Sequence, residues 1–90
     1  MRLAITYDVS ADANRRRVYR TLQRYGAWQQ YSVFEVEVSK AERVELEDEL
    51  EGHLEPSDGD RIRVYRLCSS CLDETTDLGA EQPSDQSNVI

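Results

Sequence analysis

Large apolar residues occupy every second position at the start of the chain. Leu3, Ile5 and Tyr7 are separated by smaller or polar residues, and this period of two predicts a half-buried strand over residues 2–7. The pattern stops at Asp8. The expected strand therefore ends in a carboxylate that lies at the edge of a sheet.

The next segment has the period of a helix. We expect this helix to begin at Ala11 or Asp12 and to end at Tyr25, with Gly26 in the left-handed conformation that often follows a helix. Its buried face consists of apolar residues at i, i+4 and i+7, which are Val18, Leu22 and Tyr25. Residues suited to cap its start are Ser10, Asp12 and Asn14.

Residues 27–38 favour β-structure in two parts. Phe34, Val36 and Val38 alternate with two glutamates, which predicts a half-buried strand. The phase is broken upstream, near Tyr31–Ser32. The break predicts a tight turn or a bulge, and hence two strands or one sharply bent strand.

A second helix is expected to start at Ser39, because Ser39 and Glu42 have the spacing of a capping box. Gly52 weakens the end of this helix, and a loop is expected over residues 56–59. The apolar positions of the helix are less regular than those of the first: Ala41, Val44, Leu46, Leu50 and Leu54.

The remaining pattern completes one domain. Residues 61–67 alternate and predict a strand, and an optional strand covers residues 75–78. The expected order, β-α-β-β-α-β, is that of an α+β ferredoxin-like sandwich with a possible extra C-terminal strand. We expect this domain to cover residues 1–79 and a flexible polar tail to cover residues 80–90. Because a chain of 90 residues buries only a modest core, a homodimer interface is an expected source of stability.

The formal net charge is −7, and the charge is unevenly distributed. Residues 1–38 contain six Arg and four acids, whereas residues 39–79 contain five basic residues and twelve acids. Lys40 is the only Lys among eleven basic residues, a composition that indicates adaptation to high salt, as in halophilic archaea; an ordinary acidic mesophilic protein is the alternative. No stretch has the length of a membrane span, and the N-terminus has no secretory signal, so we expect a cytoplasmic protein with no membrane partner.

Asp8 is a candidate ligand for a hard divalent cation such as Mg²⁺ or Mn²⁺, because these cations prefer carboxylate oxygens. One carboxylate per chain makes a thin site unless a two-fold axis brings two copies together. The alternative interpretation is that Asp8 serves as a cap or turn residue at the end of the strand.

Five arginines of the first expected helix form a candidate nucleic-acid-binding face. Arg16, Arg20 and Arg24 recur at i, i+4 and i+8 and so share one side of the helix. A guanidinium binds phosphate through two parallel hydrogen bonds. A solvated face paired with acids elsewhere is the alternative. The five residues are Arg15, Arg16, Arg17, Arg20 and Arg24.

A few other residues allow more than one interpretation. Trp28 and Tyr31 either stack on bases or belong to the core or an interface. His53 is expected at the surface or as a cap rather than as a catalyst. Cys68 and Cys71 form one C-x-x-C, which fits a redox pair, half of a zinc site shared by two chains, or two plain cysteines near the sheet edge.

Together these motifs resemble the CRISPR-associated protein 2 family. The resemblance covers residues 1–79 and is carried by LAITYDVS, an Arg-rich helix ending in RYG, WQQYSVFEVEVS and RIRVYRLC. It implies a ferredoxin-like protomer in a symmetric homodimer that works with the CRISPR-associated integrase to capture spacer DNA. The strongly negative charge is a departure, as is the short apolar end SNVI, for which we hypothesise strand addition to a partner.

The resemblance also implies the composition of the site. Asp8 is the metal-binding and catalytic residue near the two-fold axis, with Arg15 and Arg17 close to it. Further catalytic positions implied by the family are Tyr7, Ser32 and Phe34.

Two functions fit these expectations. The first is a dimeric scaffold that binds protospacer DNA and bridges integrase subunits during spacer acquisition. The second is a metal-dependent endonuclease that cleaves RNA or duplex DNA through paired Asp8 residues. The single acid per chain and the lack of a nearby His favour the scaffold. A ferredoxin-like module that binds a small molecule or regulates a partner is a third interpretation, and it predicts no nucleic-acid affinity at any salt concentration.

Overall fold

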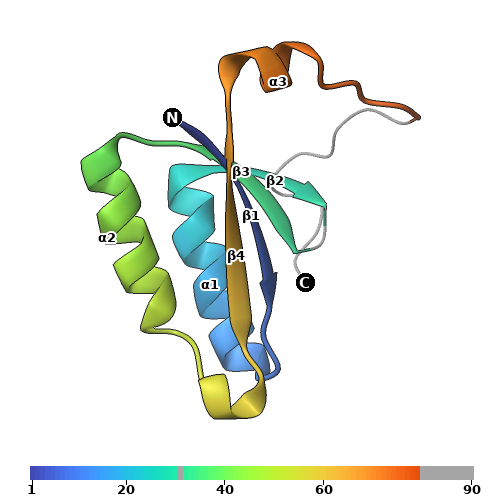
Figure 1. Cartoon of the computed structure of the whole chain (residues 1–90). Helices are drawn as coiled ribbons and strands as arrows, with labels where there is room; N and C mark the ends of the chain where they lie inside the picture. Colours follow the sequence, from blue (N-terminus) through green and yellow to red (C-terminus); the bar gives the residue numbers. More distant parts are fainter. Residues whose placement is uncertain (31, 80–90) are drawn as a thin grey trace.

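The computed structural model describes residues 1–30 and 32–79, with side chains omitted at residues 27–30. The predicted tail at residues 80–90, its SNVI end and Tyr31 lie outside the described residues. The described elements are β1 (Arg2–Asp8), α1 (Asp12–Tyr25), β2 (Gly26–Gln30), β3 (Val33–Glu37), α2 (Lys40–Glu51), a 3₁₀ turn (Pro56–Asp58), β4 (Arg61–Leu67) and α3 (Ser69–Asp73). The expected β-α-β-β-α-β order of an α+β, ferredoxin-like fold is confirmed (Figure 1).

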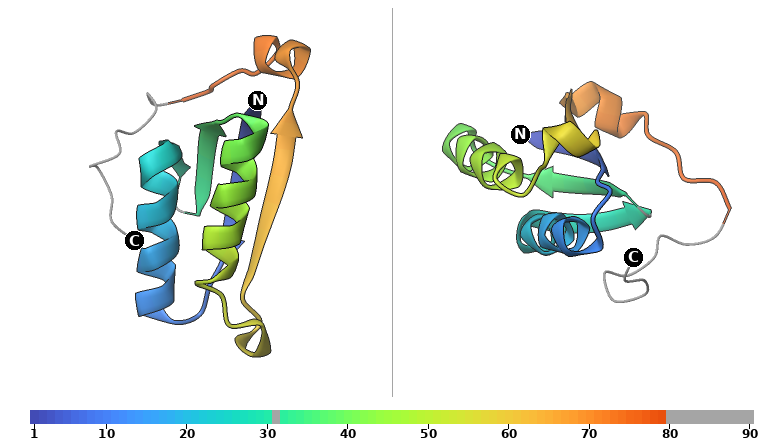
Figure 2. Two further views of the ribbon diagram at one scale, coloured as in Figure 1. Left: turned by 90° about the vertical axis from the view of Figure 1, so that its left-hand side faces the viewer. Right: turned by 90° about the horizontal axis from the view of Figure 1, so that it is seen from below.

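The strands form one antiparallel sheet in the order β2-β3-β1-β4. In the central strand β1, Ile5 lies opposite Phe34 of β3 and Val64 of β4. Both long helices lie side by side over one face of the sheet and leave the other face open (Figure 2). Within the described part of the chain, no helix is long and apolar enough to cross a bilayer.

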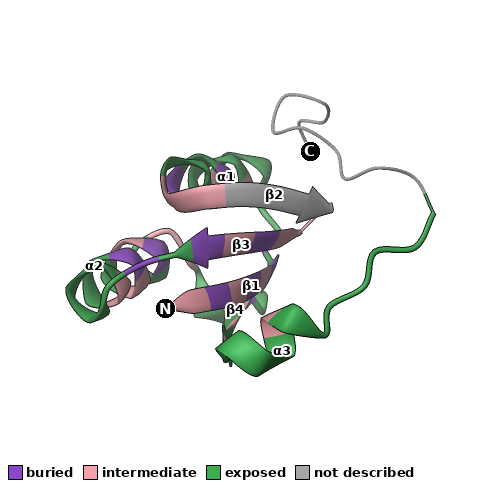
Figure 3. Cartoon of the chain, turned by 90° about the horizontal axis from the view of Figure 1, so that it is seen from above, coloured by how far each residue is buried: buried purple, intermediate pink, exposed green. Residues whose placement is uncertain are grey.

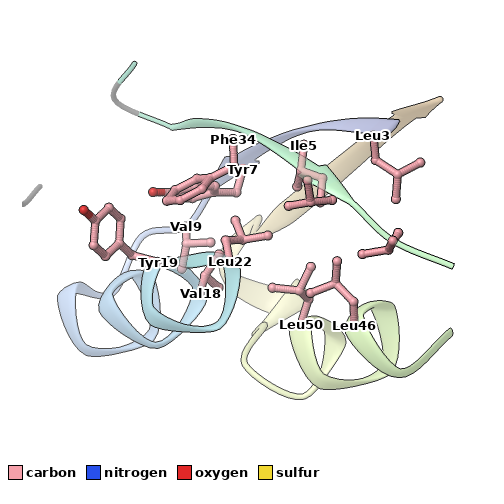
Figure 4. Packing of buried hydrophobic residues seen from close by; sticks show 12 residues of the cluster. Leu3, Ile5, Tyr7, Val9, Val18, Tyr19, Leu22, Phe34, Leu46 and Leu50 are labelled. Atoms are coloured by element: carbon pink, nitrogen blue, oxygen red, sulfur yellow. The ribbon is translucent and has the colours of Figure 1, made fainter. Parts of the chain in front are cut away.

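The core lies between the sheet and the two long helices. Along β1 and β3, buried residues alternate with more exposed ones (Figure 3). Because successive side chains of a strand lie on opposite faces, the buried ones belong to the face that the helices cover. The side chains that meet there include Leu3, Ile5, Phe34, Val18, Leu22, Leu46 and Leu50 (Figure 4). Of the apolar side predicted for the second helix, Leu46 and Leu50 are buried, whereas Val44 is 68% exposed. Ala41 is exposed as well, so the predictions for Ala41 and Val44 were wrong, because α2 contacts the core along a narrow stripe.

The two long helices start differently. Ser39 caps α2 as predicted: its hydroxyl accepts a hydrogen bond from the Glu42 backbone N–H, and the Glu42 carboxylate accepts one from the Ser39 N–H. The N-cap of α1 is Ala11, whose side chain makes no capping hydrogen bond. The three polar residues expected to cap this helix are therefore displaced from the capping position by one or more residues.

The left-handed conformation expected at Gly26 is wrong. Gly26 has extended dihedral angles (φ −167°, ψ −165°) and is the first residue of β2. A Cβ at this position would lie 2.0 Å from the Glu35 carbonyl oxygen and 2.8 Å from Val36 Cα. The glycine is therefore needed for close backbone approach to β3 rather than for a helix cap.

The strand between residues 26 and 37 is interrupted as expected. β2 and β3 are separate strands, and their register shifts between Trp28 and Gln30. The optional strand over residues 75–78, by contrast, is wrong: these residues are exposed and follow the short helix α3, which sequence analysis did not predict. Their polar sequence lacks the alternation that would fix one face against the core.

Candidate nucleic-acid interface

Asp8 ends β1 on the open face of the sheet. Its side chain is exposed, and its backbone partner in the ladder is Arg61 of β4. Neighbouring residues of β1 and β4 form a shallow polar hollow around it, lined by Thr6, Tyr7, Asp8, Arg61, Arg63 and Tyr65. The hollow thus holds one carboxylate, that of Asp8, and the guanidinium groups of Arg61 and Arg63.

A buried aspartate fixes the loop that follows Asp8. Asp60 is only 7% exposed, and its two carboxylate oxygens each accept a backbone hydrogen bond of 2.9 Å, one from Ser10 and one from Glu55. These hydrogen bonds lower the pKa of Asp60 below its usual range. Sequence analysis missed Asp60, because its partner Ser10 lies 50 positions away; the available signal was an acid placed between a Pro-Gly loop and a strand.

Arg15 stabilises the same loop. One guanidinium nitrogen donates to the carbonyl oxygens of Val9 at 3.1 Å and Ser10 at 3.4 Å, and the other forms an ion pair with Asp12. The side chain is therefore directed at the turn between β1 and α1. Its hydrogen bonds support the end of β1 that carries Asp8.

Tyr7 and Phe34, which the family resemblance places near the site, lie in the core. Tyr7 is 5% exposed and Phe34 is fully buried, and their ring centroids are 6.4 Å apart (Figure 4). Because side chains alternate along a strand, Tyr7 points to the face opposite that of Asp8. Burial raises the pKa of Tyr7 to about 12, so the phenol is protonated at neutral pH.

Ser32 joins β1 through its backbone. Its carbonyl oxygen accepts a 3.2 Å hydrogen bond from the Tyr7 N–H, just before Asp8. The structure thus brings Tyr7, Ser32 and Phe34 together around the end of β1. Of the predicted catalytic residues, Asp8 presents its side chain on the open face.

The arginines of α1 are not equivalent. Arg24 forms an ion pair with Glu49 of α2, and Arg17 donates a 2.7 Å hydrogen bond to Asn14. Arg16 and Arg20 are exposed and have no ion-pair partner among the described residues. We call Arg16, Arg17, Arg20 and Arg24 the arginine stripe of α1. Within it, Arg16 and Arg20 have the fewest competing contacts.

The stripe continues into a groove between the two helices. Thr21, only 3% exposed, donates a 3.0 Å hydrogen bond to Glu49 and lies 3.1 Å from Nε2 of His53. The groove is lined by Arg17, Arg20, Thr21, Arg24, Glu49 and His53. His53 is half-buried at this helix contact, where it helps to join the helices.

The described residues do not assemble a metal site within one chain. No group of three or more His, Cys, Asp or Glu among them is arranged to hold a metal ion. Cys68 and Cys71 are both exposed and free. The stacking role considered for Trp28 and Tyr31 concerns side chains outside the described residues.

Comparisons with known proteins agree with each other. The family described as CRISPR associated protein Cas2 matches residues 1–75. The chain is 44% identical over 90 residues to "CRISPR-associated endoribonuclease Cas2 2" of Methanospirillum hungatei, covering all of this chain and 99% of that protein.

Two solved structures have the same fold. Streptococcus pyogenes Cas2, crystallised at pH 6.5, superimposes with a TM-score of 0.76 at 31% identity, covering 88% of this chain and all of the other. A chain of a partial Cas6-RT-Cas1–Cas2 complex superimposes with a TM-score of 0.72 at 30% identity, covering 86% of this chain and 89% of that chain.

Proposed function

This chain belongs to the CRISPR-associated Cas2 family, and from that premise we propose that it is a dimeric scaffold that binds protospacer DNA and bridges integrase subunits during spacer acquisition. A similar chain occurs in a complex with Cas1, which supports an integrase of this kind as the partner. The observation that carries the DNA-binding part is the exposed arginine stripe on α1, in which Arg16 and Arg20 lack ion-pair partners among the described residues.

The charge pattern restricts where DNA binds. α2 carries six acids against two basic residues, and it lies beside α1 on the same face of the sheet. Carboxylates repel the phosphate backbone, so we expect the duplex to contact the exposed arginines of α1 and not the surface of α2. Arg24 neutralises Glu49 at the boundary between the two helices. The remaining guanidinium groups are left to contact phosphate.

The open face of the sheet is the proposed dimer interface. The chain's own long helices cover the other face (Figure 3). The open face presents Asp8 from β1 together with Arg61, Arg63 and the 45% exposed Tyr65 from β4. A second copy on this face would cover the aromatic ring and offer carboxylates to the guanidinium groups. It would also bring two Asp8 side chains toward one axis.

A metal-dependent endonuclease acting on RNA or duplex DNA is the second candidate, favoured because the Methanospirillum relative is named an endoribonuclease. The donor set of one chain does not fit Mg²⁺ or Mn²⁺, since a single carboxylate is accompanied by Arg61 and Arg63. Metal binding would therefore require Asp8 from two copies. The nuclease depends on dimerisation, whereas phosphate binding by α1 does not.

The first experiment separates the two functions with Asp8→Ala. The variant and the parent protein are compared in Mg²⁺-dependent cleavage of RNA and duplex DNA and in spacer integration with the partner integrase, at low and high salt. The scaffold proposal expects integration to persist. Loss of integration by a folded, dimeric variant would contradict it, and cleavage abolished beside intact integration would identify a nuclease that integration does not need.

A second experiment tests the arginine stripe itself. Arg16→Gln with Arg20→Gln should weaken duplex binding at least tenfold at low salt, because two phosphate contacts are lost. Arg43→Gln is the matched control, since Arg43 lies on α2 and pairs with Glu47. Equal affinity of the double variant and the control would overturn the assignment of the DNA-binding face.

A further inference from the structure

The two cysteines lie far from Asp8, at the opposite end of the sheet. Cys68 directly follows β4, and Leu67 at the end of β4 pairs with Arg2, whereas Asp8 pairs with Arg61 at the other end. Six residues of strand separate these ends, about 20 Å at the rise of a strand. Figure 1 shows α3 at the end of the sheet where the N-terminus begins. Neither proposed function uses this end of the molecule.

The geometry of the pair is that of a dithiol ready to close. Cys68 and Cys71 are both exposed, and their sulfur atoms are 3.0 Å apart. A disulfide bond is about 2.05 Å long, so the sulfurs need to approach by only about 1 Å. Because Cys68 is the N-cap of α3 and Cys71 lies in its first turn, this approach requires no movement of the sheet.

The surroundings also differentiate the two sulfurs. Cys68 Sγ lies 3.2 Å from Ser70 Oγ and accepts a hydrogen bond from the Cys71 N–H at 3.4 Å. Hydrogen bonds with the Cys71 thiol, and to a smaller extent with Ser70, lower the pKa of Cys68 to about 7. The contact between the two sulfurs raises the pKa of Cys71. Cys68 is thus the thiolate nucleophile at neutral pH, and Cys71 is the thiol that reacts second.

We propose that Cys68 and Cys71 form a thiol–disulfide exchange site whose substrates are low-molecular-weight disulfides. The Cys68 thiolate attacks one sulfur of the small disulfide, breaks its S–S bond and releases one small thiolate, which takes a proton from water. Cys71 loses its proton to water, and its sulfur attacks Cys68 Sγ and displaces the second small thiolate. Two protein thiols are oxidised to one disulfide, and one small disulfide is reduced to two thiols.

A metal site explains this pair less well. Within the described residues no third His, Cys, Asp or Glu joins the two sulfurs as a ligand. Structural zinc is held by four ligands, so two thiols of one chain would leave the ion half-coordinated. Exchange chemistry needs only the two sulfurs present.

Intact-mass measurement with oxidised glutathione tests the proposal. After incubation at pH 7, the parent protein should lose two hydrogens and retain no glutathione, and dithiothreitol should reverse the change. Cys71→Ser should retain one glutathione, because the second attack is removed. A parent protein that retains two glutathiones, or that does not react, would refute the exchange site.

The rate of the Cys71→Ser variant provides a test that a merely structural role would not pass. At pH 7, the parent protein should react with oxidised glutathione about fourfold faster than Cys71→Ser, because the variant lacks the Cys71 thiol that lowers the pKa of Cys68. The difference should shrink as the pH rises, since Cys68 is then ionised in both proteins. The Cys71 side chain is exposed, so the variant should fold. Equal rates of the parent protein and Cys71→Ser at pH 7 would contradict the activation of Cys68 by Cys71.

Discussion

At the residue scale, Gly26 shows how closely two strands approach. Gly26→Ala would place a Cβ against the Glu35 carbonyl and the Val36 backbone, neither of which yields as a flexible side chain does. We expect a loss of at least about 2 kcal/mol in the free energy of unfolding, measured by urea denaturation. Gly52→Ala is the matched control: Gly52 has α-helical dihedral angles, and the change there should stay within about 0.5 kcal/mol. If Gly26→Ala changed the free energy of unfolding as little as Gly52→Ala does, β2 would be free to move away from β3 and make room for the Cβ.

Asp60 gives a prediction of pH dependence. Its pKa is lowered by backbone hydrogen bonds, so its stabilising contribution is present above the unfolded-state pKa of about 4 and is lost as pH falls through the folded-state pKa. Asp60→Asn should lower the melting temperature at pH 7, and the difference from the parent protein should shrink below about pH 4. Asp58→Asn, at an exposed position in the neighbouring turn, is the control. A difference that is constant from pH 7 to pH 3 would mean that the carboxylate charge is not involved.

At the element scale, substitutions at the N-caps of α2 and α1 should change the free energy of unfolding in opposite directions. Ser39→Ala removes a complete capping box from α2 and should lower the free energy of unfolding by about 1 kcal/mol. Ala11→Ser adds a hydroxyl at the extended N-cap of α1, where no side chain caps the helix, and should raise it by up to about 1 kcal/mol. Chemical denaturation measures both. A destabilising Ala11→Ser would indicate that the Arg15 contacts with the preceding loop leave no room for the cap.

The elements differ in how well sequence patterns predicted them. β1, α1 and β4 were predicted within about one residue, because strict periods of 2 and 3.6 identify the face that packs on the core. Gly26 was misassigned because its role depends on a neighbouring strand, and α3 was missed because five residues are too few for a period. The position of Asp8 at a strand end followed from local pattern. The support from Asp60 did not, since it joins residues distant in sequence.

At the scale of the whole molecule, the net charge of −7 and the arginine stripe on α1 make opposite demands on DNA binding. Each phosphate contact contributes about −0.9 to the slope of log affinity against log salt. Three exposed arginines that are not paired with an acid, Arg16, Arg17 and Arg20, then allow a slope of about −2.7 if one chain contacts the duplex. If both chains of a dimer contact it, the slope is about −5.4.

The double variant Arg16→Gln with Arg20→Gln turns this slope into a count of bound chains. The slope should become shallower by about 2 if one chain contacts the duplex and by about 4 if both do. Fluorescence anisotropy of a labelled duplex at a series of salt concentrations measures it, with Arg43→Gln as the control whose slope should not change. An unchanged slope in the double variant would place the phosphate contacts elsewhere. A change of about 4 would support the proposed dimer in its DNA-bound state. Each chain of the double variant lacks two arginines, so a change of this size means that the arginines of both chains contact one duplex.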